Sequence, residues 1–324
     1  MNKRSSIEQL ERAMQQVLSD RGAPLPQVKG EVGRLLQIAA ALRDLPRPTF
    51  KAKLKRELEE KTMSTATVSS PARAGFTTIT PYLQVREANE LVEFIKNAFG
   101  GEEIFRSGPG SEGGMHCEMR IGDSMLMIGG GPAWRGTPKP SAIHLYVKDA
   151  DTTYQRALAA GATVLNELTD QPYGDREGCV KDAFGNHWYI ATNRATGAAP
   201  SGLGNVTLSL HPKGADKLMA FLKQAFDAEE VFRAASPEGV IHHAQVRIGN
   251  SILEIGEAHG QYQPIPGAIF LYVPDAAASY KRALEAGASS LWSPAEMYGD
   301  LMSGVADPFG NDWYIATHLG SAAQ

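Results

Sequence analysis

The chain has 324 residues, of which 43% are hydrophobic and 21% are charged, and its formal net charge is −4. This composition is typical of a soluble globular protein with room for two domains and additional segments. The polar N-terminus and the lack of an eighteen-residue apolar run argue against secretion and membrane spanning, so we expect a cytoplasmic protein. The two cysteines, Cys117 and Cys179, occupy non-matching positions, which argues against a disulfide framework or a thiolate metal site and favours two buried thiols.

Apolar residues recur at helical spacing in three segments near the N-terminus, at 6–20, 28–42 and 50–58, and they predict a small helical arm. Residues 1–63 contain 13 Lys/Arg against 8 Asp/Glu, whereas the remainder contains 19 against 28. The basic arm has no aromatic interleaving and no zinc-finger spacing, so we expect no nucleic-acid binding. The sequence leaves open whether the arm docks on the first repeat domain, on a second copy in a homodimer, or on a separate protein.

A repeat organises the rest of the chain. The stretch YGDREGCVKDAFGNHWYIAT at 173–192 returns as YGDLMSGVADPFGNDWYIAT at 298–317, with 13 of 20 positions identical at an offset of 125. A repeat of this length indicates two tandem copies of one domain. We therefore predict five parts: an arm at 1–63, a linker at 64–75, a first domain at 76–194, a linker at 195–204, and a second domain at 205–320.

Each copy is predicted to contain two βαβββ modules, which makes the fold class α+β with four modules in total. In the first copy the predicted strands lie at 77–85, 103–106, 114–121, 124–128, 142–147, 163–165 and 187–191, and the predicted helices at 88–99 and 150–160. The second copy repeats this order: LMAFLKQAF at 218–226 matches LVEFIKNAF at 91–99, and RIGNSILEIG at 247–256 matches RIGDSMLMIG at 120–129.

The paired modules, the helix ending in AAGA at 159–162 and the terminal DAFGNHWYI at 182–190 together resemble the vicinal oxygen chelate superfamily of glyoxalases, bleomycin-resistance proteins and extradiol dioxygenases. The narrower resemblance is to its glyoxalase-like branch. It implies that each copy curls its sheet around a concave cup that holds the ligand.

In that superfamily a divalent ion is held by His, Gln and Glu at particular strand positions. The resemblance places these positions on Thr80, Met127, Ala142 and Tyr189 in the first copy, and on Thr207, Glu254, Ala268 and Tyr314 in the second. Only Glu254 can serve as a ligand, whereas a divalent cation needs three or four converging donors. We therefore expect no metal and no other cofactor.

The same matching, combined with strand alternation, predicts the side chains that line each cup. The first cup is expected to contain Tyr82, Gln84, His144, Tyr146, His187 and Tyr189, with His116 and Glu118 on one face of the third strand and Trp134 and Tyr173 on loops at the mouth. The second cup is expected to contain Ser209, His211, Tyr272 and Tyr314, with His243, Gln245 and Glu254 nearby. Aromatic walls with a few polar groups suit a small organic ligand. Trp188 and Trp313 are interpreted as core residues, and Asp175, Arg176 and Asp182 as parts of loops.

The resemblance thus implies a glyoxalase-like or bleomycin-resistance-like protein that binds a small organic molecule in aromatic-lined cups without the usual catalytic metal. The alternative is a metal-dependent lyase or dioxygenase of the same superfamily that uses non-standard ligands such as His116, Glu118 and His144. A third interpretation is an interaction module whose arm docks a regulator. The sequence leaves open whether any reaction is catalysed and which cup is functional.

Overall fold

The computed structural model describes residues 71–108, 114–260 and 263–320. By its internal contacts the chain divides into two units, Met1–Ser69 and Ser70–Gln324, and the described residues all belong to the second. The helices predicted for the N-terminal arm lie outside the described residues. Among the helices that are described, none is long and apolar enough to cross a membrane.

The first copy folds as two βαβββ modules, which confirms the predicted order of elements. These are β1 (Ile79–Val85), α4 (Ala88–Phe99), β2 (Glu102–Arg106), β3 (Met115–Ile121), β4 (Ser124–Gly130), β5 (Ala142–Tyr146), α5 (Ala150–Ala159), β6 (Thr163–Asp170), β7 (Asp175–Lys181) and β8 (His187–Asn193). The interpretation of Asp175 and Arg176 as loop residues is wrong, because both begin strand β7.

The second copy repeats the two modules. Its elements are β9 (Val206–Leu210), α6 (Ala215–Phe226), β10 (Glu229–Ala235), β11 (Ile241–Ile248), β12 (Ser251–Ile255), β13 (Ala268–Tyr272), α7 (Ala276–Glu285), β14 (Ser289–Met297), β15 (Asp300–Ala306) and β16 (Asp312–His318). Both copies therefore supply the same set of strands and helices.

The helices form where apolar residues recur on one face and residues that favour a helix end lie at each terminus. In α4 the buried side chains include Leu91, Ile95 and Ala98, which recur at the spacing of one helix face. Gly100 ends α4 in the left-handed region with φ 69°, a conformation that costs glycine little. Helix α5 begins at Asp149, whose carboxylate accepts a hydrogen bond from the Thr152 amide.

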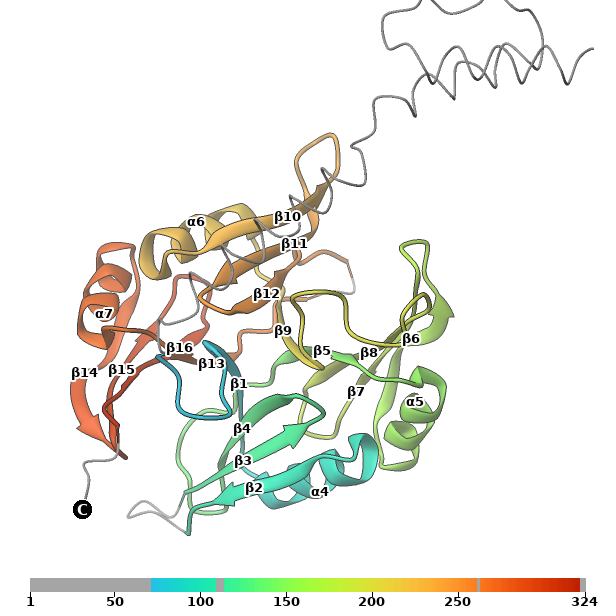
Figure 1. Ribbon diagram of the computed structural model, residues 1–324, viewed down its shortest axis with the longest axis horizontal. Helices are drawn as coiled ribbons and strands as arrows, with labels where there is room; N and C mark the ends of the chain where they lie inside the picture. Colours follow the sequence, from blue (N-terminus) through green and yellow to red (C-terminus); the bar gives the residue numbers. More distant parts are fainter. Residues whose placement is uncertain (1–70, 109–113, 261–262, 321–324) are drawn as a thin grey trace, which may run out of the picture. The chain divides into compact units, whose positions relative to one another are not determined.

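The strands of the two copies pair with each other, and this pairing creates two mixed sheets. One sheet has the order β14-β15-β16-β13-β1-β4-β3-β2, and the other has the order β10-β11-β12-β9-β5-β8-β7-β6 (Figure 1). Strand β1 runs antiparallel to β13 with Thr80 opposite Phe270. Strand β5 runs antiparallel to β9 with His144 opposite Thr207. The first module is thus joined to the fourth, and the second to the third.

Hydrogen bonds between the sheets repeat with the same symmetry. The Ile79 amide donates to Ser251 Oγ at 2.9 Å, and the Val206 amide donates to Ser124 Oγ at 3.1 Å. Each strand that begins a copy is therefore fixed to the β-hairpin turn of the other copy. These contacts hold the two sheets together as one unit.

Each copy nevertheless keeps a core of its own. One hydrophobic cluster contains Leu91, Ile143 and Trp188 and is made of first-copy residues except for Val206. A second cluster contains Leu218, Ile269 and Trp313 and is made of second-copy residues except for Ile79. Trp188 and Trp313 are fully buried, as predicted, and so are Cys117 and Cys179. Because side chains alternate along a strand, the opposite faces of the same strands are left to line the cups.

Candidate functional site

Two cups result from the mixed sheets, and each contains strands of both copies. We call cup A the side chains of β1, β3, β4, β13, β15 and β16 that face away from the two hydrophobic cores, and cup B the corresponding side chains of β5, β7, β8, β9, β11 and β12. The prediction of one cup for each copy is therefore wrong. Tyr82 and Gln84 share cup A with Tyr272 and Tyr314, while His144 and Tyr189 share cup B with His211 and Glu254.

A histidine between two carboxylates occupies the centre of cup B. His144 Nδ1 donates to Glu254 Oε2 at 2.8 Å, and His144 Nε2 lies 3.2 Å from Glu177 Oε2. Glu254 is 3% exposed, and its other oxygen accepts from Gln245 Nε2 at 3.3 Å and lies 3.8 Å from His243 Nε2. A charged group buried to this degree must be paired, and these contacts supply the pairs.

The contacts of His144 and Glu254 determine the charge of each of the two side chains. Burial opposes a charged imidazole, but the Glu254 and Glu177 carboxylates outweigh it and raise the pKa of His144 to about 10. Burial likewise opposes a charged Glu254, yet the neighbouring His144 holds the pKa of that carboxyl below its usual value. At neutral pH the centre of cup B is therefore an imidazolium between carboxylates.

Aromatic rings surround this charged centre. The Tyr146 ring stacks on the His144 ring with centroids 4.4 Å apart, and the Tyr146 hydroxyl donates to Asp175 Oδ2 at 2.9 Å. Tyr189 stacks on His211 at 5.7 Å. Burial lowers the pKa of His211 to about 4, so this imidazole is neutral and acts as a flat, weakly polar surface. His187, also in cup B, has a pKa lowered to about 4 by burial.

Cup A has an apolar interior instead. A hydrophobic cluster on its strands contains Met127, Phe270, Tyr272 and Tyr314, with Tyr82 and Trp292 packed against it. Trp292 stacks on Tyr314 at 5.1 Å, and the Tyr314 hydroxyl accepts a hydrogen bond from Gln84 Nε2 at 2.7 Å. The aromatic side chains that the sequence placed in a cup fill much of this one.

The charged groups of cup A lie at its β3 edge. The Glu118 side chain forms an ion pair with Arg73 and lies 3.3 Å from His116 Nε2. Both His116 and Glu118 face the cup A aromatics, since His116 lies edge-on to Tyr82 at 5.7 Å. His144 contacts cup B residues in the other sheet, so the predicted grouping of His116 and Glu118 with His144 is wrong.

The two cups differ at positions that the repeat makes equivalent. Where cup B has the three charged residues at its centre, cup A has an aromatic ring and two thioethers. The equivalent pairs are His144 and Phe270, Glu254 and Met127, and Glu177 and Met302. Both cups keep a tyrosine bonded to an aspartate, because Tyr272 donates to Asp300 Oδ2 at 3.3 Å as Tyr146 does to Asp175.

Of the two loop residues predicted at a cup mouth, Tyr173 lies beside cup B, whereas Trp134 packs within its own loop. Tyr173 is 65% exposed, and its hydroxyl donates to Glu177 Oε2 at 3.2 Å, which places it beside cup B. Trp134 is half-buried in the loop after β4, where its indole packs against Gly136 and Gly114. Glu177 was not predicted as a cup residue, although it lies two positions after Asp175 on β7 and therefore on the same face of the strand.

Asp182 in that stretch is structural, as predicted. Its carboxylate accepts from the Phe184 amide, the Asn186 amide and side chain, and the Trp188 indole, each at 2.9 Å. The turn thereby positions β8, and Asp307 makes the same set of bonds in the second copy. Within the repeated stretch, the segment from Asp182 to Asn186 thus builds the turn before the last strand.

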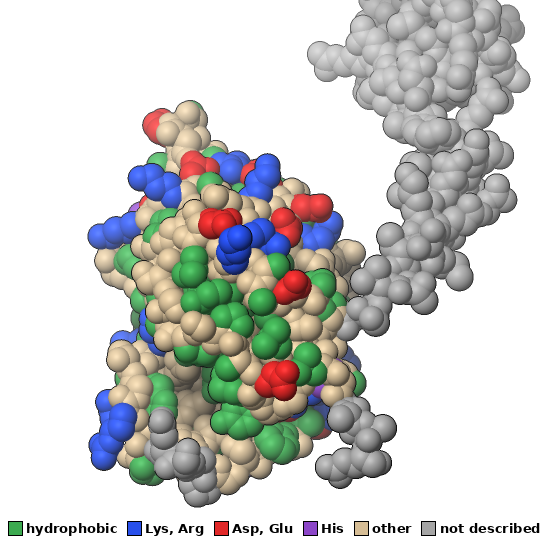
Figure 2. Space-filling view, turned by 90° about the vertical axis from the view of Figure 1, so that its left-hand side faces the viewer, with side chains coloured by type: hydrophobic (Ala, Val, Ile, Leu, Met, Phe, Trp, Pro, Cys, Tyr) green, Lys and Arg blue, Asp and Glu red, His purple; other side chains and the backbone are tan. Residues whose placement is uncertain are grey.

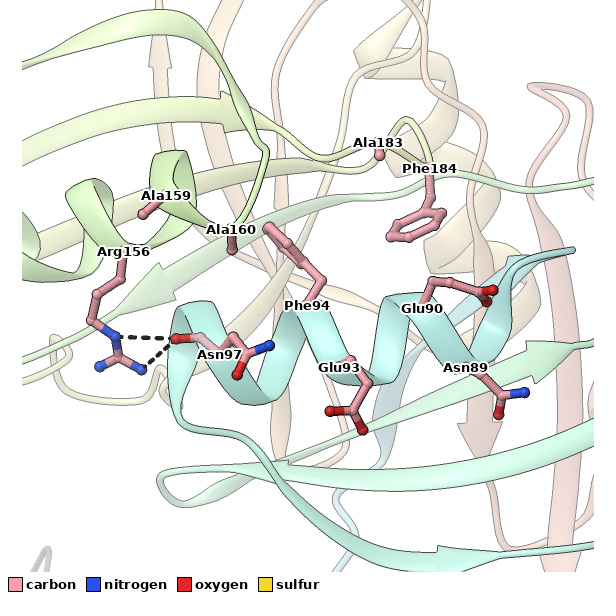
Figure 3. A pocket seen from close by; sticks show the side chains of 10 residues that line it. All are labelled: Asn89, Glu90, Glu93, Phe94, Asn97, Arg156, Ala159, Ala160, Ala183 and Phe184. Carbon is pink, nitrogen blue, oxygen red and sulfur yellow. Dashed lines mark hydrogen bonds between the residues drawn. The ribbon is translucent and has the colours of Figure 1, made fainter.

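A separate groove lies on the helical side of the first copy (Figure 3). It has a volume of 700 Å³ and lies between α4 and α5, with Phe94 and Phe184 on its apolar wall and Glu90 and Glu93 on its polar side. Arg156 spans the helices at one end by donating to the Asn97 carbonyl at 3.0 Å.

Figure 2 shows another face, toward α7 and β14, where hydrophobic side chains gather among charged ones. Leu291 of β14 is 44% exposed.

Comparisons with known proteins agree with this architecture. An uncharacterized protein of Mycobacterium bovis is 40% identical over 123 residues, which are 35% of this chain and 80% of that protein. An uncharacterized protein of Mycobacterium tuberculosis has the same identity over 123 residues, which are 72% of its length. Glyoxalase I from Zea mays has a similar fold, with a TM-score of 0.57 at 13% identity over 74% of this chain and 92% of that chain.

A family model described as the Glyoxalase/Bleomycin resistance protein/Dioxygenase superfamily matches residues 75–190 and 207–315. These ranges cover more than half of the chain and coincide with the four βαβββ modules. The resemblance seen in the repeated motifs is thereby confirmed, and the chain belongs to the Glyoxalase/Bleomycin resistance protein/Dioxygenase superfamily.

Proposed function

We propose that the protein binds a small organic molecule in cup B and does so without a divalent metal. The observation that carries the proposal is the His144 imidazolium, stacked on Tyr146 and held between Glu254 and Glu177. Burying charges costs free energy unless each is well paired. Cup A shows that the same backbone accepts Phe270 and Met127 at two of these places. The charges are therefore not required by the fold, which favours a role in binding.

The composition of cup B indicates the class of ligand. Glu254 and Glu177 outnumber the imidazolium charge of His144, so the centre favours hydrogen-bond donors and positive charge. The stacked Tyr189 and His211 offer a flat surface for a ring. A planar organic compound that carries amino or hydroxyl groups satisfies both requirements.

The superfamily's divalent ion does not fit these residues. In cup B both ring nitrogens of His144 face carboxylates, so the imidazole carries a proton where a metal would need its lone pair. In cup A the places of His144 and Glu254 are taken by Phe270 and Met127, which supply no hard donor.

Calorimetric titration with a panel of amino- and hydroxyl-substituted aromatic compounds tests the proposal. Wild type is expected to bind a subset of them, and His144→Phe and Glu254→Met, which introduce the cup A residues, are expected to weaken binding at least tenfold. His318→Asn is the matched control, because Asn193 has that place in the first copy and also bonds to an aspartate.

Two results would contradict the proposal. One is equal binding by wild type and both cup B variants, which would place the ligand elsewhere. The other is elemental analysis that finds stoichiometric zinc, nickel or iron in protein purified without a chelator, lost on His144→Phe and retained on His318→Asn. That second outcome would favour a metal-dependent lyase or dioxygenase.

A further inference from the structure

Cup A is covered by the segment of chain that precedes its first strand. Residues 73–76 form a turn in which the Phe76 amide donates to the Arg73 carbonyl at 3.0 Å. Phe76 is 9% exposed and packs with Tyr272, their ring centroids 6.2 Å apart, while Ala72 packs on the same hydrophobic cluster. This turn begins the coloured part of the chain in Figure 1. It places one side chain, Arg73, directly over the charged edge of the cup.

Arg73 is bound there as a ligand would be. Its guanidinium pairs with the Glu118 carboxylate and lies 4.5 Å from the centroid of the Phe76 ring. Glu118 is 5% exposed, and His116 Nε2 is 3.3 Å from the carboxylate oxygen that Arg73 contacts. Phe76 belongs to the same turn as Arg73, so the fixed part of the site is the buried Glu118 carboxylate with His116 beside it, and a buried carboxylate is a favourable partner for a guanidinium.

The equivalent place in cup B shows that the fold does not require this contact. The same turn precedes β9, where the Leu203 amide donates to the Pro200 carbonyl at 3.0 Å. Pro200 stands where Arg73 does, and Gln245 stands where Glu118 does. The cation and the carboxylate are thus both present in cup A and both replaced in cup B. This joint difference ties Arg73 to Glu118.

We propose that cup A is a guanidinium-binding site that the chain occupies with its own Arg73, and that a free guanidinium compound binds there when the turn at 73–76 lifts. The compound class is a monosubstituted guanidinium with a short alkyl chain, which reproduces the arginine side chain. Arg73 acts as an intramolecular competitor. The proposal depends on cup A residues alone and is independent of the ligand proposed for cup B.

The charge state of the site supports this assignment. Burial disfavours a charged Glu118, but His116 and Arg73 hold the pKa of its carboxyl below the usual value. The carboxylate is therefore ionised at neutral pH while a cation is beside it. Because Arg73 is tethered by a short turn, its effective concentration at Glu118 is on the order of millimolar, and a free competitor must exceed that level.

Titration of the full chain with methylguanidinium chloride, followed by calorimetry, tests the proposal. Arg73→Ala is expected to bind methylguanidinium at least tenfold more tightly than wild type does. Arg73→Ala combined with Glu118→Gln, which introduces the cup B residue, is expected to lose saturable binding. Methylammonium at the same ionic strength is the ligand control. Arg73→Lys is the variant control, because lysine keeps the positive charge at this position but lacks the planar guanidinium.

Equal affinities of Arg73→Ala and wild type would overturn the proposal, and so would binding that survives Glu118→Gln. A measurement on wild type covers the case in which Arg73→Ala fails to fold. At tens of millimolar methylguanidinium the turn is expected to lift, so the Phe76 amide should exchange with solvent at least threefold faster than in methylammonium. An unchanged exchange rate would contradict the displacement of Arg73.

Discussion

Replacement of His144 by phenylalanine removes the cation from the centre of cup B and leaves the backbone and the ring in place. Phe270 occupies the equivalent position in cup A, opposite Thr80, so the substituted ring suits this strand geometry. The variant leaves Glu254, which is 3% exposed, without its hydrogen bond from Nδ1. Breaking a buried pair on one side costs about 3–5 kcal/mol, because the remaining charge loses its partner.

The raised pKa of His144 also gives the size of the stabilisation that His144→Phe removes. It rises from 6.5 to about 10 on folding, and each pH unit between the two values corresponds to about 1.4 kcal/mol, so the stabilisation is on the order of 5 kcal/mol. A pKa raised by folding contributes fully below the unfolded value and is lost as pH rises through the folded value. Wild-type stability is therefore expected to fall between about pH 6.5 and 10, and His144→Phe should lack this fall.

Urea unfolding of both proteins at pH 6, 8 and 9.5 measures the effect. The difference in unfolding free energy is expected to be largest at pH 6 and to shrink toward pH 9.5. Adding Glu254→Met to His144→Phe should recover much of the loss, because the buried carboxylate is then also gone. A difference that does not vary with pH, or a double variant as unstable as the sum of its two single variants, would refute the reasoning.

Further predictions concern positions outside the charged centre. Asp182→Asn is expected to lower the unfolding free energy by about 2 kcal/mol or more, because an amide cannot accept from all the donors that face this carboxylate, and chemical denaturation measures it. Gly130→Ala should lower the unfolding free energy by at least about 3 kcal/mol, because a Cβ at this position, where φ is 148°, would lie 1.6 Å from the Val85 carbonyl oxygen of β1. Gly161→Ala meets nothing within 4 Å and should lower it by about 1–2 kcal/mol, the cost of a positive φ alone. Thermal melts of the two variants measure the difference. Burial raises the pKa of the Cys117 thiol to about 11 and that of Cys179 further, so a disulfide reagent at pH 8 should label neither in the folded protein and both in urea.

Local features of the fold could be predicted because their causes are local. The bounds of α4 follow from an apolar stripe that stops at Gly100, and the turn at Asp182 follows from side chains that bond to their own backbone. Trp188 could be assigned to the core since it alternates with cup residues on β8. In each case the interaction that decides the structure lies within a few residues of the one it positions.

Pairing between strands could not be predicted in the same way. The two copies present nearly the same strand sequences, so β1 has equally suitable edges in β5 and in β13. The observed partner is β13, whose Ile269 and Phe270 lie opposite Pro81 and Thr80, nearly two hundred residues away in the sequence. Residues such as Tyr82, His144 and Glu254 were placed on the correct strands, but the cups were assembled from the wrong pairs of modules.

Glu177 illustrates a second kind of omission. It lies in the repeated stretch between Asp175 and Cys179, and its partner His144 is brought near by the pairing of β5 with β8 and β8 with β7. Strand alternation alone would have put Glu177 on the same face as Asp175. A loop interpretation of the segment concealed that signal, because its glycines and aspartates are typical of turns.

Duplication makes the two cups a comparison of side chains on nearly the same backbone. A residue type present in both, such as the tyrosine bonded to an aspartate, belongs to the requirements of the fold. Residues that differ together are independent of those requirements: His144 with Glu254 in cup B, and Arg73 with Glu118 in cup A. Each cup thus has a buried glutamate, Glu254 in cup B and Glu118 in cup A, that pairs with a cation from within the chain. In cup B the cation is part of the sheet, whereas in cup A it lies on the turn before β1. The displacement of Arg73 proposed above would therefore give a ligand a route into cup A that cup B lacks.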